Sequence, residues 1–384
     1  MLCVAFAEAL GTERVGIDDD FIRLGGDSLK AIRAASVCRE SGTEVSVSDI
    51  LSRRTPARIA SLMRKTGPGA VCTVESGCPL TGGSLDVYLD IESGKSGALY
   101  IINEVYEIPS GISDDAVKYT ILKMLDVHPV LCSRITVADG VPYLSPGASP
   151  EITVSEGPAR DIRRPFELSQ SLCRFHIVSG SRIQAAFHHT IFDGMSSDIV
   201  RRTLDRLFAG ERPEKDTVYL DDASQFAAAD VDAGLEYFRA MLSSIPDDCL
   251  LIDDVKGDYG SGSLDLSASF TAISERARFF GTIPANMLAS AFGYMLSRFT
   301  GSSGAVFETI INGREQAGTG VGMFVRTLPI AIDCSDRSVR EFIESSSDVL
   351  FGVISNQRCP FHAVAREFGL NFGIVFNYMS GMDE

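Results

Sequence analysis

The stretch Phe187-His188-His189-Thr190-Ile191-Phe192-Asp193-Gly194 lies near the middle of the chain of 384 residues. Residues 182–187 before it read as a short strand, and the Asp-Gly pair that closes it signals a turn. Because successive side chains of a strand point to opposite faces, His188 and His189 cannot both face one cavity. We therefore expect one histidine to be a candidate catalyst and the other to be structural, with Asp193 placed where the chain turns.

Two adjacent histidines are weak support for catalysis by themselves, since a pair of partly buried histidines at a strand end is common. A metal site built on His-His-x-x-x-Asp would need further ligands. The remaining histidines, which are His128, His176 and His362, offer no obvious completing pair. We therefore expect no metal.

The composition excludes several classes of protein. A hydrophobic content of 45% with 22% charged residues is ordinary for a globular protein, and the length allows two or three domains. The net charge of −16 argues against nucleic acid or an anionic membrane as a partner. Nine scattered cysteines without a Cys-x-x-Cys pair fit free thiols in a reducing compartment. With no secretory signal and no bilayer-spanning apolar run in the sequence, we expect a cytoplasmic protein.

The stretch Asp18-Asp19-Asp20-Phe21-Ile22-Arg23-Leu24-Gly25-Gly26-Asp27-Ser28-Leu29 indicates a sharp turn followed by a helix. The two glycines allow the turn, and Asp27 is a natural N-cap for the helix beyond it. Ser28 is then in the first helical turn, where free backbone N–H groups and the helix dipole favour a phosphate. Lys30 adds positive charge nearby.

The run Asp-x-Phe-x-x-Leu-Gly-Gly-Asp-Ser-Leu, in a helical unit of residues 1–65, resembles the peptidyl carrier domain of nonribosomal peptide synthetases. The resemblance implies an all-α four-helix bundle in which Ser28 bears the covalent cofactor 4′-phosphopantetheine. Expected helices at 47–51 and 56–65 fit it. Residues 66–77 have no helical period and read as a linker.

The rest of the chain resembles a condensation domain of the same synthetases, because several short motifs follow one another in the family's order. They are Pro79-Leu80-Thr81, His128-Pro129-Val130-Leu131, Pro165-Phe166-Glu167-Leu168, the stretch 187–194 and Gly322-Met323-Phe324-Val325-Arg326-Thr327-Leu328-Pro329. The resemblance implies an α+β protein overall, in which two chloramphenicol-acetyltransferase-like α/β lobes form a V with a tunnel between them. We expect an N-lobe at 78–210 and a C-lobe at 211–384 that is incomplete at Glu384.

The resemblance implies an acyltransferase that forms a peptide bond. An acceptor amine attacks an aminoacyl or peptidyl thioester held by the arm on Ser28. His189 faces the tunnel and takes a proton from the amine or orients it, while His188 supports the strand. Asp193 holds the loop through a salt bridge to an arginine, and Gly194 allows close backbone approach. The partners implied are a downstream acceptor carrier, an adenylation domain and a phosphopantetheinyl transferase.

Some residues depart from the family pattern. Cys132 stands where the family commonly has an arginine, so Asp193 is expected either to pair with Arg174 or to be unpaired. Further departures are Ser84, Asp86 and Arg326.

Two other functions remain open. An epimerisation domain shares the fold and the His-His motif, and Phe376-Asn377-Tyr378 suits one, although the run that begins at Gly322 follows the condensation pattern. A catalytically silent recruitment module is the third possibility.

Sequence periodicity also gives expectations for single elements. We expect strands at 98–108, 264–271 and 305–311, and helices at 196–208, 223–242 and 286–299.

Overall fold

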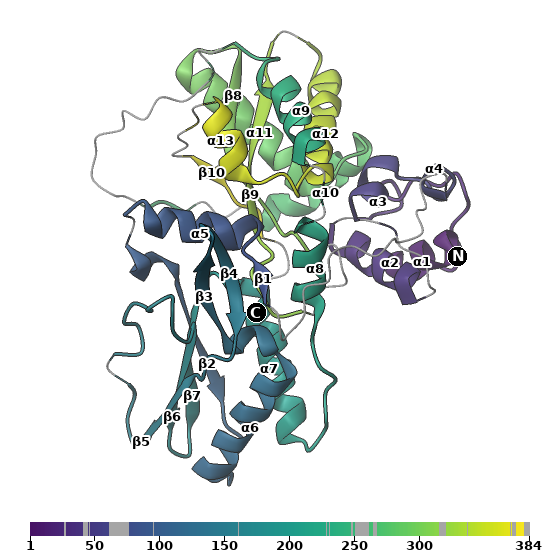
Figure 1. Ribbon diagram of the computed structural model, residues 1–384. Coiled ribbons are helices and arrows are strands. Elements are labelled where there is room, and N and C mark those ends of the chain that lie inside the picture. The colour runs from purple at the N-terminus through teal and green to yellow at the C-terminus, as the bar shows by residue number, and fades with distance from the viewer. Residues whose placement is uncertain are drawn as a thin grey trace. The chain divides into compact units, whose positions relative to one another are not determined.

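The structure is a computed structural model, shown as a ribbon in Figure 1. It describes residues 1–26, 28–40, 45, 47–60, 77–94, 96–159, 161–227, 229, 231–246, 249, 261–263, 267–314, 320–335, 337–368, 370 and 374–379. The chain divides into two compact units, of which the first comprises Met1–Gly67, Asp230–Ala317 and Arg326–Glu384 and the second comprises Pro68–Ala229 and Gly318–Val325. The expected linker 66–77 lies outside the described residues, except for Gly77.

The N-terminal part of the first unit holds the four helices that the sequence indicates. They are α1 (Leu2–Leu10), α2 (Ser28–Glu40), α3 (Val47–Arg53) and α4 (Pro56–Ala60). Helix α1 ends at Gly11, whose φ of 69° is left-handed and therefore suits glycine. The helices enclose a common apolar core that includes Phe6, Phe21, Ile22, Ile50, Leu51 and Ile59.

The remainder of the first unit is a three-stranded sheet with helices. Its elements are α9 (Val231–Leu242), α10 (Ser267–Phe279), α11 (Pro284–Thr300), β8 (Gly304–Ile311), β9 (Arg326–Asp333), α12 (Val339–Ser355), α13 (Phe361–Phe368) and β10 (Val375–Phe376). The strand order is β10-β8-β9, with β9 antiparallel and β10 parallel to β8. Helices α11 and α12 pack on β8 and β9, respectively.

Three sequence expectations for single elements were wrong in type or extent. Residues 267–271 begin helix α10 rather than continue a strand, because Ile273 and Ala277 lie four residues apart on its inner side. The helix expected at 223–242 is two helices, α8 (Val218–Ala227) and α9, with the boundary of the two units between them. The strand expected at 98–108 starts only at Ile101, after a 3₁₀ turn.

The second unit contains two sheets. Its elements are β1 (Cys78–Pro79), α5 (Gly82–Glu92), η1 (Gly97–Tyr100), β2 (Ile101–Glu107), α6 (Asp114–Val127), η2 (Pro129–Cys132), β3 (Ser133–Ala138), β4 (Val141–Pro146), β5 (Glu151–Ser155), β6 (Cys173–Val178), β7 (Arg182–His188), α7 (Gly194–Phe208) and α8. The sheets have the strand orders β1-β4-β3 and β2-β7-β6-β5. In the larger sheet β2, β7 and β6 are antiparallel neighbours, and β5 runs parallel to β6.

The two faces of the larger sheet have different coverings. Alternate residues of β6, namely Cys173, Phe175 and Ile177, belong to the same core as side chains of α6 and α7. These two helices lie along one side of the sheet (Figure 1). The residues between them point to the other face, where residues 157–159 and 161–168 lie. There Arg174 donates to the carbonyl oxygen of Arg164, and the Ala159 N–H donates to Gln184.

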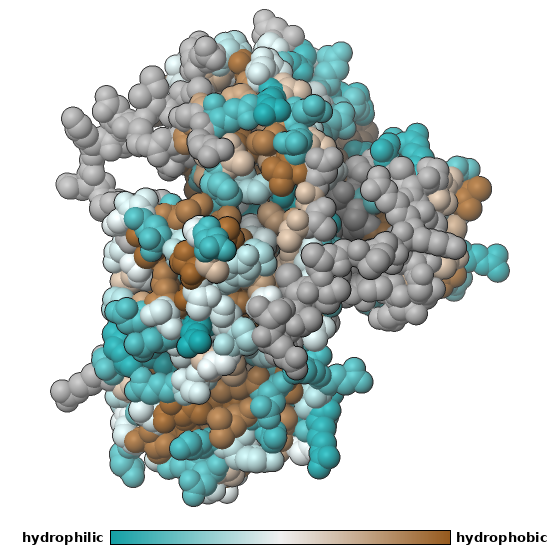
Figure 2. Space-filling model, viewed as in Figure 1, coloured by the Kyte–Doolittle hydropathy of each residue, from teal (hydrophilic) through white to brown (hydrophobic). Residues whose placement is uncertain are grey.

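The surface is mixed. Figure 2 shows hydrophilic side chains over much of the second unit and a hydrophobic patch low on the face in view. Val105 on β2 and Leu122 on α6 are among the exposed apolar side chains. Among the described residues, no helix combines the length and the apolar character needed to cross a membrane.

Candidate active site

The His-His pair lies where β7 ends. His188 is the last residue of β7, and its backbone N–H donates to the carbonyl of Leu172 at 2.8 Å. The next residue, His189, donates its backbone N–H to Tyr100 at 2.8 Å. Both histidines are therefore fixed through the backbone by neighbouring segments of the same sheet.

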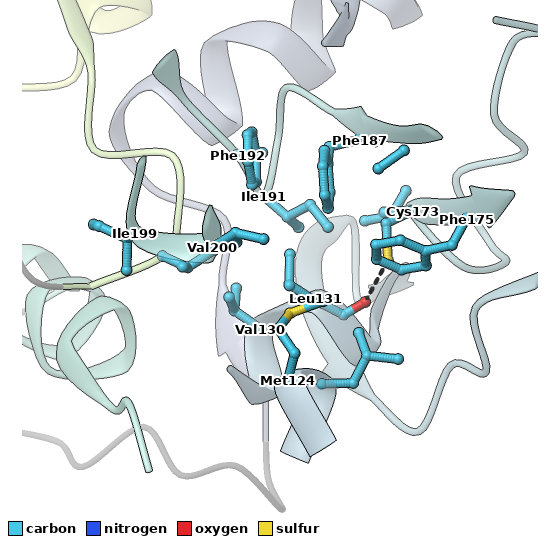
Figure 3. Close-up of a cluster of buried hydrophobic side chains, with 14 of the residues drawn as sticks. Met124, Val130, Leu131, Cys173, Phe175, Phe187, Ile191, Phe192, Ile199 and Val200 are labelled. Atoms are coloured by element: carbon cyan, nitrogen blue, oxygen red, sulfur yellow. Dashed lines mark hydrogen bonds between the residues drawn. The ribbon is translucent and has the colours of Figure 1, made fainter. Parts of the chain in front are cut away.

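The turn between the strand and α7 is anchored in the apolar core. The rings of Phe187 and Phe192, which flank the turn, stack with centroids 3.9 Å apart (Figure 3). Phe175 meets Phe187 edge-on at 5.7 Å, and Ile191 is fully buried in the same cluster. The four residues 188–191 are thus held at both ends by stacked aromatic rings.

His189 has a defined tautomer. Its Nδ1 atom lies 2.8 Å from the carbonyl oxygen of Phe192. Because a carbonyl oxygen only accepts, Nδ1 carries the hydrogen, and the lone pair of the neutral ring is on Nε2. The residue is partly exposed, so its Nε2 suits a base or a hydrogen-bond acceptor for an incoming amine.

His188 has the opposite tautomer and is buried. Its Nδ1 atom accepts from the backbone N–H of Thr190 at 3.3 Å and lies 2.8 Å from the Thr190 hydroxyl. The ring hydrogen is therefore on Nε2. Burial, together with the nearby charge of His189, lowers the pKa of His188 to about 4. His188 is neutral at physiological pH, which fits the structural role that the sequence indicated.

Asp193 is fully buried at the N-terminus of α7 and is not paired with Arg174. Its Oδ1 accepts from the backbone N–H of Ser196 at 3.0 Å and from the Ser196 hydroxyl at 2.8 Å, and its Oδ2 accepts from Phe324 N–H at 3.1 Å. Arg174 donates instead to the carbonyls of Arg164 and Pro165. The expected pairing of Asp193 with Arg174 was therefore wrong, and backbone amides and a hydroxyl contact the carboxylate.

Residues 320–325, far from residues 68–229 in the sequence, contact this part of the site through their backbone amides. We call residues 320–325 the inserted segment; it belongs to the second unit, whereas β9, which follows it, belongs to the first. Its amides donate to Asp193, to the Ser196 hydroxyl at 3.1 Å and to Asp216 at 2.7 Å. Sequence analysis missed this role, because backbone amides leave no side-chain signature.

Ser84 turns out to support the His-His turn. Its buried hydroxyl donates to the carbonyl of Thr190 at 2.8 Å and lies 2.6 Å from the Tyr219 hydroxyl. The other departure near the site, Cys132, is partly buried, and burial raises the pKa of its thiol. Ser84 therefore has a structural role in this chain that its departure from the family pattern did not reveal.

Gly194 is the first residue of α7 and faces open space. No protein atom among the described residues lies within 4 Å of the position that a Cβ would occupy, and φ is not in the left-handed region. Neither packing nor backbone conformation therefore requires a glycine here.

The turn around Ser28 fits a covalently attached phosphate ester. Ser28 begins the 13-residue helix α2, and the Lys30 ammonium caps the Gly25 carbonyl at 2.7 Å in the same turn. Gly25 has a φ of +93°, and a Cβ on Gly26 would lie only 2.3 Å from the Phe21 ring. The two glycines are therefore needed for this turn, whereas the expected N-cap Asp27 lies outside the described residues.

No group of three or more His, Cys, Asp or Glu side chains in the described part of the chain is arranged to hold a metal ion. His128 is bonded to Asp216 and Thr203, and His176 to Thr153, Ser155 and Gly157.

Comparison with known proteins gives the family. A condensation domain model matches residues 146–378, and a phosphopantetheine attachment site model matches residues 2–63. Phosphinothricin tripeptide synthetase PhsB from Streptomyces viridochromogenes is 26% identical over 95% of this chain and 35% of its own length. Tyrocidine synthase 3 from Brevibacillus parabrevis is 24% identical over the whole chain and 7% of its own length. The chain thus spans about a third or less of these relatives.

Solved structures show the same fold. The first condensation domain of the calcium-dependent antibiotic (CDA) synthetase has a TM-score of 0.59 and 19% identity, over 80% of this chain and 83% of that one. The condensation domain of the monacolin K polyketide synthase MokA also has a TM-score of 0.59, at 15% identity over 77% of this chain and 76% of that one.

The chain belongs to the condensation domain family of nonribosomal peptide synthetases, an acyltransferase-type family whose members form peptide bonds. A phosphopantetheine attachment domain precedes the condensation domain. The α+β fold expected from the sequence is confirmed.

Proposed function

We propose that this chain is a donor carrier followed by the condensation domain that uses it. In this proposal, the amine of an acceptor held by a second carrier attacks the carbonyl carbon of the aminoacyl or peptidyl thioester attached at Ser28. The C–N bond forms, the C–S bond breaks, and the sulfur leaves as the free thiol of the arm. The observation that carries the proposal is the tautomer of His189, because the bond from Nδ1 to Phe192 leaves Nε2 as an acceptor on a partly exposed side chain.

His189 Nε2 accepts a hydrogen bond from the attacking amine and takes its proton as the amide forms. General-base action is typically worth about 10²–10⁴-fold in rate. A thioester is already activated toward amines, so the orientation of the amine contributes at least as much. His188 keeps the strand in place, Asp193 fixes the start of α7, and Gly194 leaves room for the backbone to approach the substrate.

Ser28 is the proposed attachment residue of 4′-phosphopantetheine. When bound, this group supplies a terminal thiol that carries the donor acyl group. The first turn of α2 presents backbone N–H groups to the phosphate, and Lys30 contributes a positive charge beside it.

The test uses the whole chain. A phosphopantetheinyl transferase loads Ser28 from synthetic aminoacyl-coenzyme A, releasing adenosine 3′,5′-bisphosphate, an acceptor carrier bearing an amino acid is added, and the dipeptide is measured by mass. We expect a dipeptide on the acceptor, no loading of Ser28→Ala, and a rate for His189→Ala that is lower by about 100-fold at equal loading. An unchanged rate for His189→Ala would remove His189 from the mechanism.

The same assay in D₂O separates the other two functions. Deuterium at the donor α-carbon without any acceptor would identify an epimerisation domain. A fully loaded carrier that gives neither dipeptide nor deuterium exchange would identify a silent recruitment module. The run from Gly322 to Pro329 supports condensation over epimerisation.

The proposal includes the cellular context. We propose carrier limits at 1–65, a linker at 66–77, an N-lobe at 78–210 and a C-lobe at 211–384. An adenylation domain and a phosphopantetheinyl transferase would supply the donor amino acid and the arm. A reducing cytoplasm is supported by the cysteines, since none of the eight within the described residues forms a disulfide.

A further inference from the structure

Strand β6 carries a buried arginine that the proposed reaction does not use. Arg174 is 6% exposed, although its neighbours Cys173 and Phe175 are apolar core residues. A buried guanidinium is stable only when its donors are satisfied. Arg174 donates to the carbonyl oxygen of Arg164 at 2.9 Å and to that of Pro165 at 3.2 Å. These two bonds fix the backbone of residues 164–165 against strand β6.

The next residue of that chain connects the arginine to the His-His pair. The Cζ atom of Arg174 lies 3.8 Å from the ring centroid of Phe166, which is a close cation–π contact. The same ring meets the imidazole of His188 at a centroid distance of 5.9 Å and an interplanar angle of 84°. Guanidinium, phenyl and imidazole therefore follow one another in contact, and we call Arg174, Phe166 and His188 the aromatic stack.

The stack ends one residue before the proposed base. The ring of His188 is held on one side by Phe166 and, through Nδ1, by Thr190 on the other. Thr190 is the residue directly after His189. The imidazole of His188 therefore bonds to the residue that follows the proposed base. A shift of the His188 ring would therefore move Thr190 and the turn that presents His189.

We propose that Arg174 and Phe166 are positioning residues for amide formation: Arg174 clamps the chain 164–166 to the sheet, and Phe166 caps His188 so that the turn holds His189 in its reactive tautomer. This inference rests on the proposed function of His189. Arg174 and Phe166 do not touch the reacting atoms in this scheme.

The variants separate the two parts of the stack. Arg174→Lys keeps a cation near Phe166 but lacks the planar fork that reaches both carbonyls. Phe166→Leu keeps apolar cover and loses the ring, whereas Phe166→Tyr keeps the ring and serves as the conservative rescue. The matched control is Arg340→Lys, because Arg340 lies over Phe279 at 5.0 Å in the first unit, whereas the His-His turn belongs to the second.

Two readouts are needed. The first is dipeptide formation with saturating and limiting acceptor, which separates kcat from KM. The second is the ¹⁵N spectrum of the apo chain labelled at its five histidines, with His189 assigned from the His189→Ala variant, which reports the tautomer without any reaction. Thermal unfolding of each variant is recorded alongside.

We expect Arg174→Lys and Phe166→Leu to lower kcat by about tenfold with little change in KM, because a small displacement of a catalytic group is costly. The His189 spectrum of both should change from one tautomer to a mixture, and Phe166→Tyr and Arg340→Lys should match the wild type in both readouts. A single unchanged His189 tautomer in folded Phe166→Leu would overturn the inference. Equal losses of kcat in Arg340→Lys would do the same.

Failure of the proposed function is distinguishable from failure of this inference. If the wild type forms no dipeptide, the condensation proposal fails, and the tautomer spectra alone decide whether the stack positions His189. If Arg174→Lys does not fold, Phe166→Leu compared with Phe166→Tyr gives the same decision.

Discussion

The rings of Phe187 and Phe192 lie 3.9 Å apart with their planes only 3° from parallel, although four residues separate them in the chain. The stack closes residues 188–191 into a compact turn, and the Phe192 carbonyl at its end fixes the His189 tautomer. Phe192 therefore has two roles. Its ring packs in the core, and its backbone oxygen accepts the hydrogen bond from the proposed base.

Phe192→Leu tests the contribution of this stack to stability. The leucine keeps apolar volume in the core but loses the ring contact, so the free energy of unfolding should fall by about 1–2 kcal/mol. Urea denaturation of wild type and variant gives the difference. Phe299→Leu is the control, since Phe299 is 89% exposed and its replacement should change stability little. Equal midpoints for Phe192→Leu and wild type would contradict the prediction.

His188 should make stability depend on pH. Its pKa is about 4 in the folded chain and about 6.5 in the unfolded chain, so between these values only the unfolded chain binds the proton. The free energy of unfolding is therefore highest above pH 6.5. It falls by up to about 3 kcal/mol as the pH is lowered toward 4.

The comparison for His188 uses His188→Asn, whose side-chain oxygen can take the place of Nδ1 as acceptor for Thr190. The variant should be less stable than the wild type at pH 7, and the gap should narrow between pH 6.5 and 4. Parallel stability curves over this range would show that His188 does not titrate as stated.

Asp193→Asn should destabilise the second unit. One oxygen of the amide can still accept from Ser196, but the NH₂ group would then face the Phe324 N–H, which leaves a buried donor without an acceptor. We expect a loss of about 1–3 kcal/mol in the free energy of unfolding. Asp198→Asn on the same helix removes an exposed ion pair with Arg201 and should cost under about 1 kcal/mol. Equal effects of the two substitutions would argue against the buried network.

Gly194→Ala should separate stability from activity. Since a Cβ at Gly194 meets open space, the folded chain should be as stable as the wild type or more stable by up to about 1 kcal/mol. If the substrate approaches this backbone, dipeptide formation should fall several-fold at the same time. Gly97→Ala, which also meets open space, should have the same small effect on stability and leave dipeptide formation unchanged. Full activity of Gly194→Ala would remove Gly194 from the substrate contact.

The architecture could be predicted from the sequence to a large extent, because short motifs with fixed order and spacing mark both domains. The four N-terminal helices follow from apolar spacing and from the turn at Gly25-Gly26. Helices at 196–208 and 286–299 and the strand at 305–311 agree with α7, α11 and β8 within two residues at each end. Periodicity failed where the pattern was short, as at residues 267–271, while residues 264–266 of that expected strand lie outside the described residues.

The contacts of the site were harder to predict than its residues. Asp193 was expected to pair with Arg174, yet one of its contacts is a backbone amide of Phe324, far along the chain. An amide is present at almost every residue, so no sequence pattern marks the one that is used. Arg174 did leave a signal, since a charged residue in an otherwise apolar strand must have partners, but the sequence could not show that Phe166 is one of them.

The inserted segment also limits how this protein can be recombined with its relatives. A chimaera that takes residues 78–229 from one parent and 320–325 from another would join a carboxylate and its amide donors that had not been selected together. Exchanges that move both stretches as a pair should preserve the start of α7, whereas a crossover placed between them is expected to yield poorly folded hybrids.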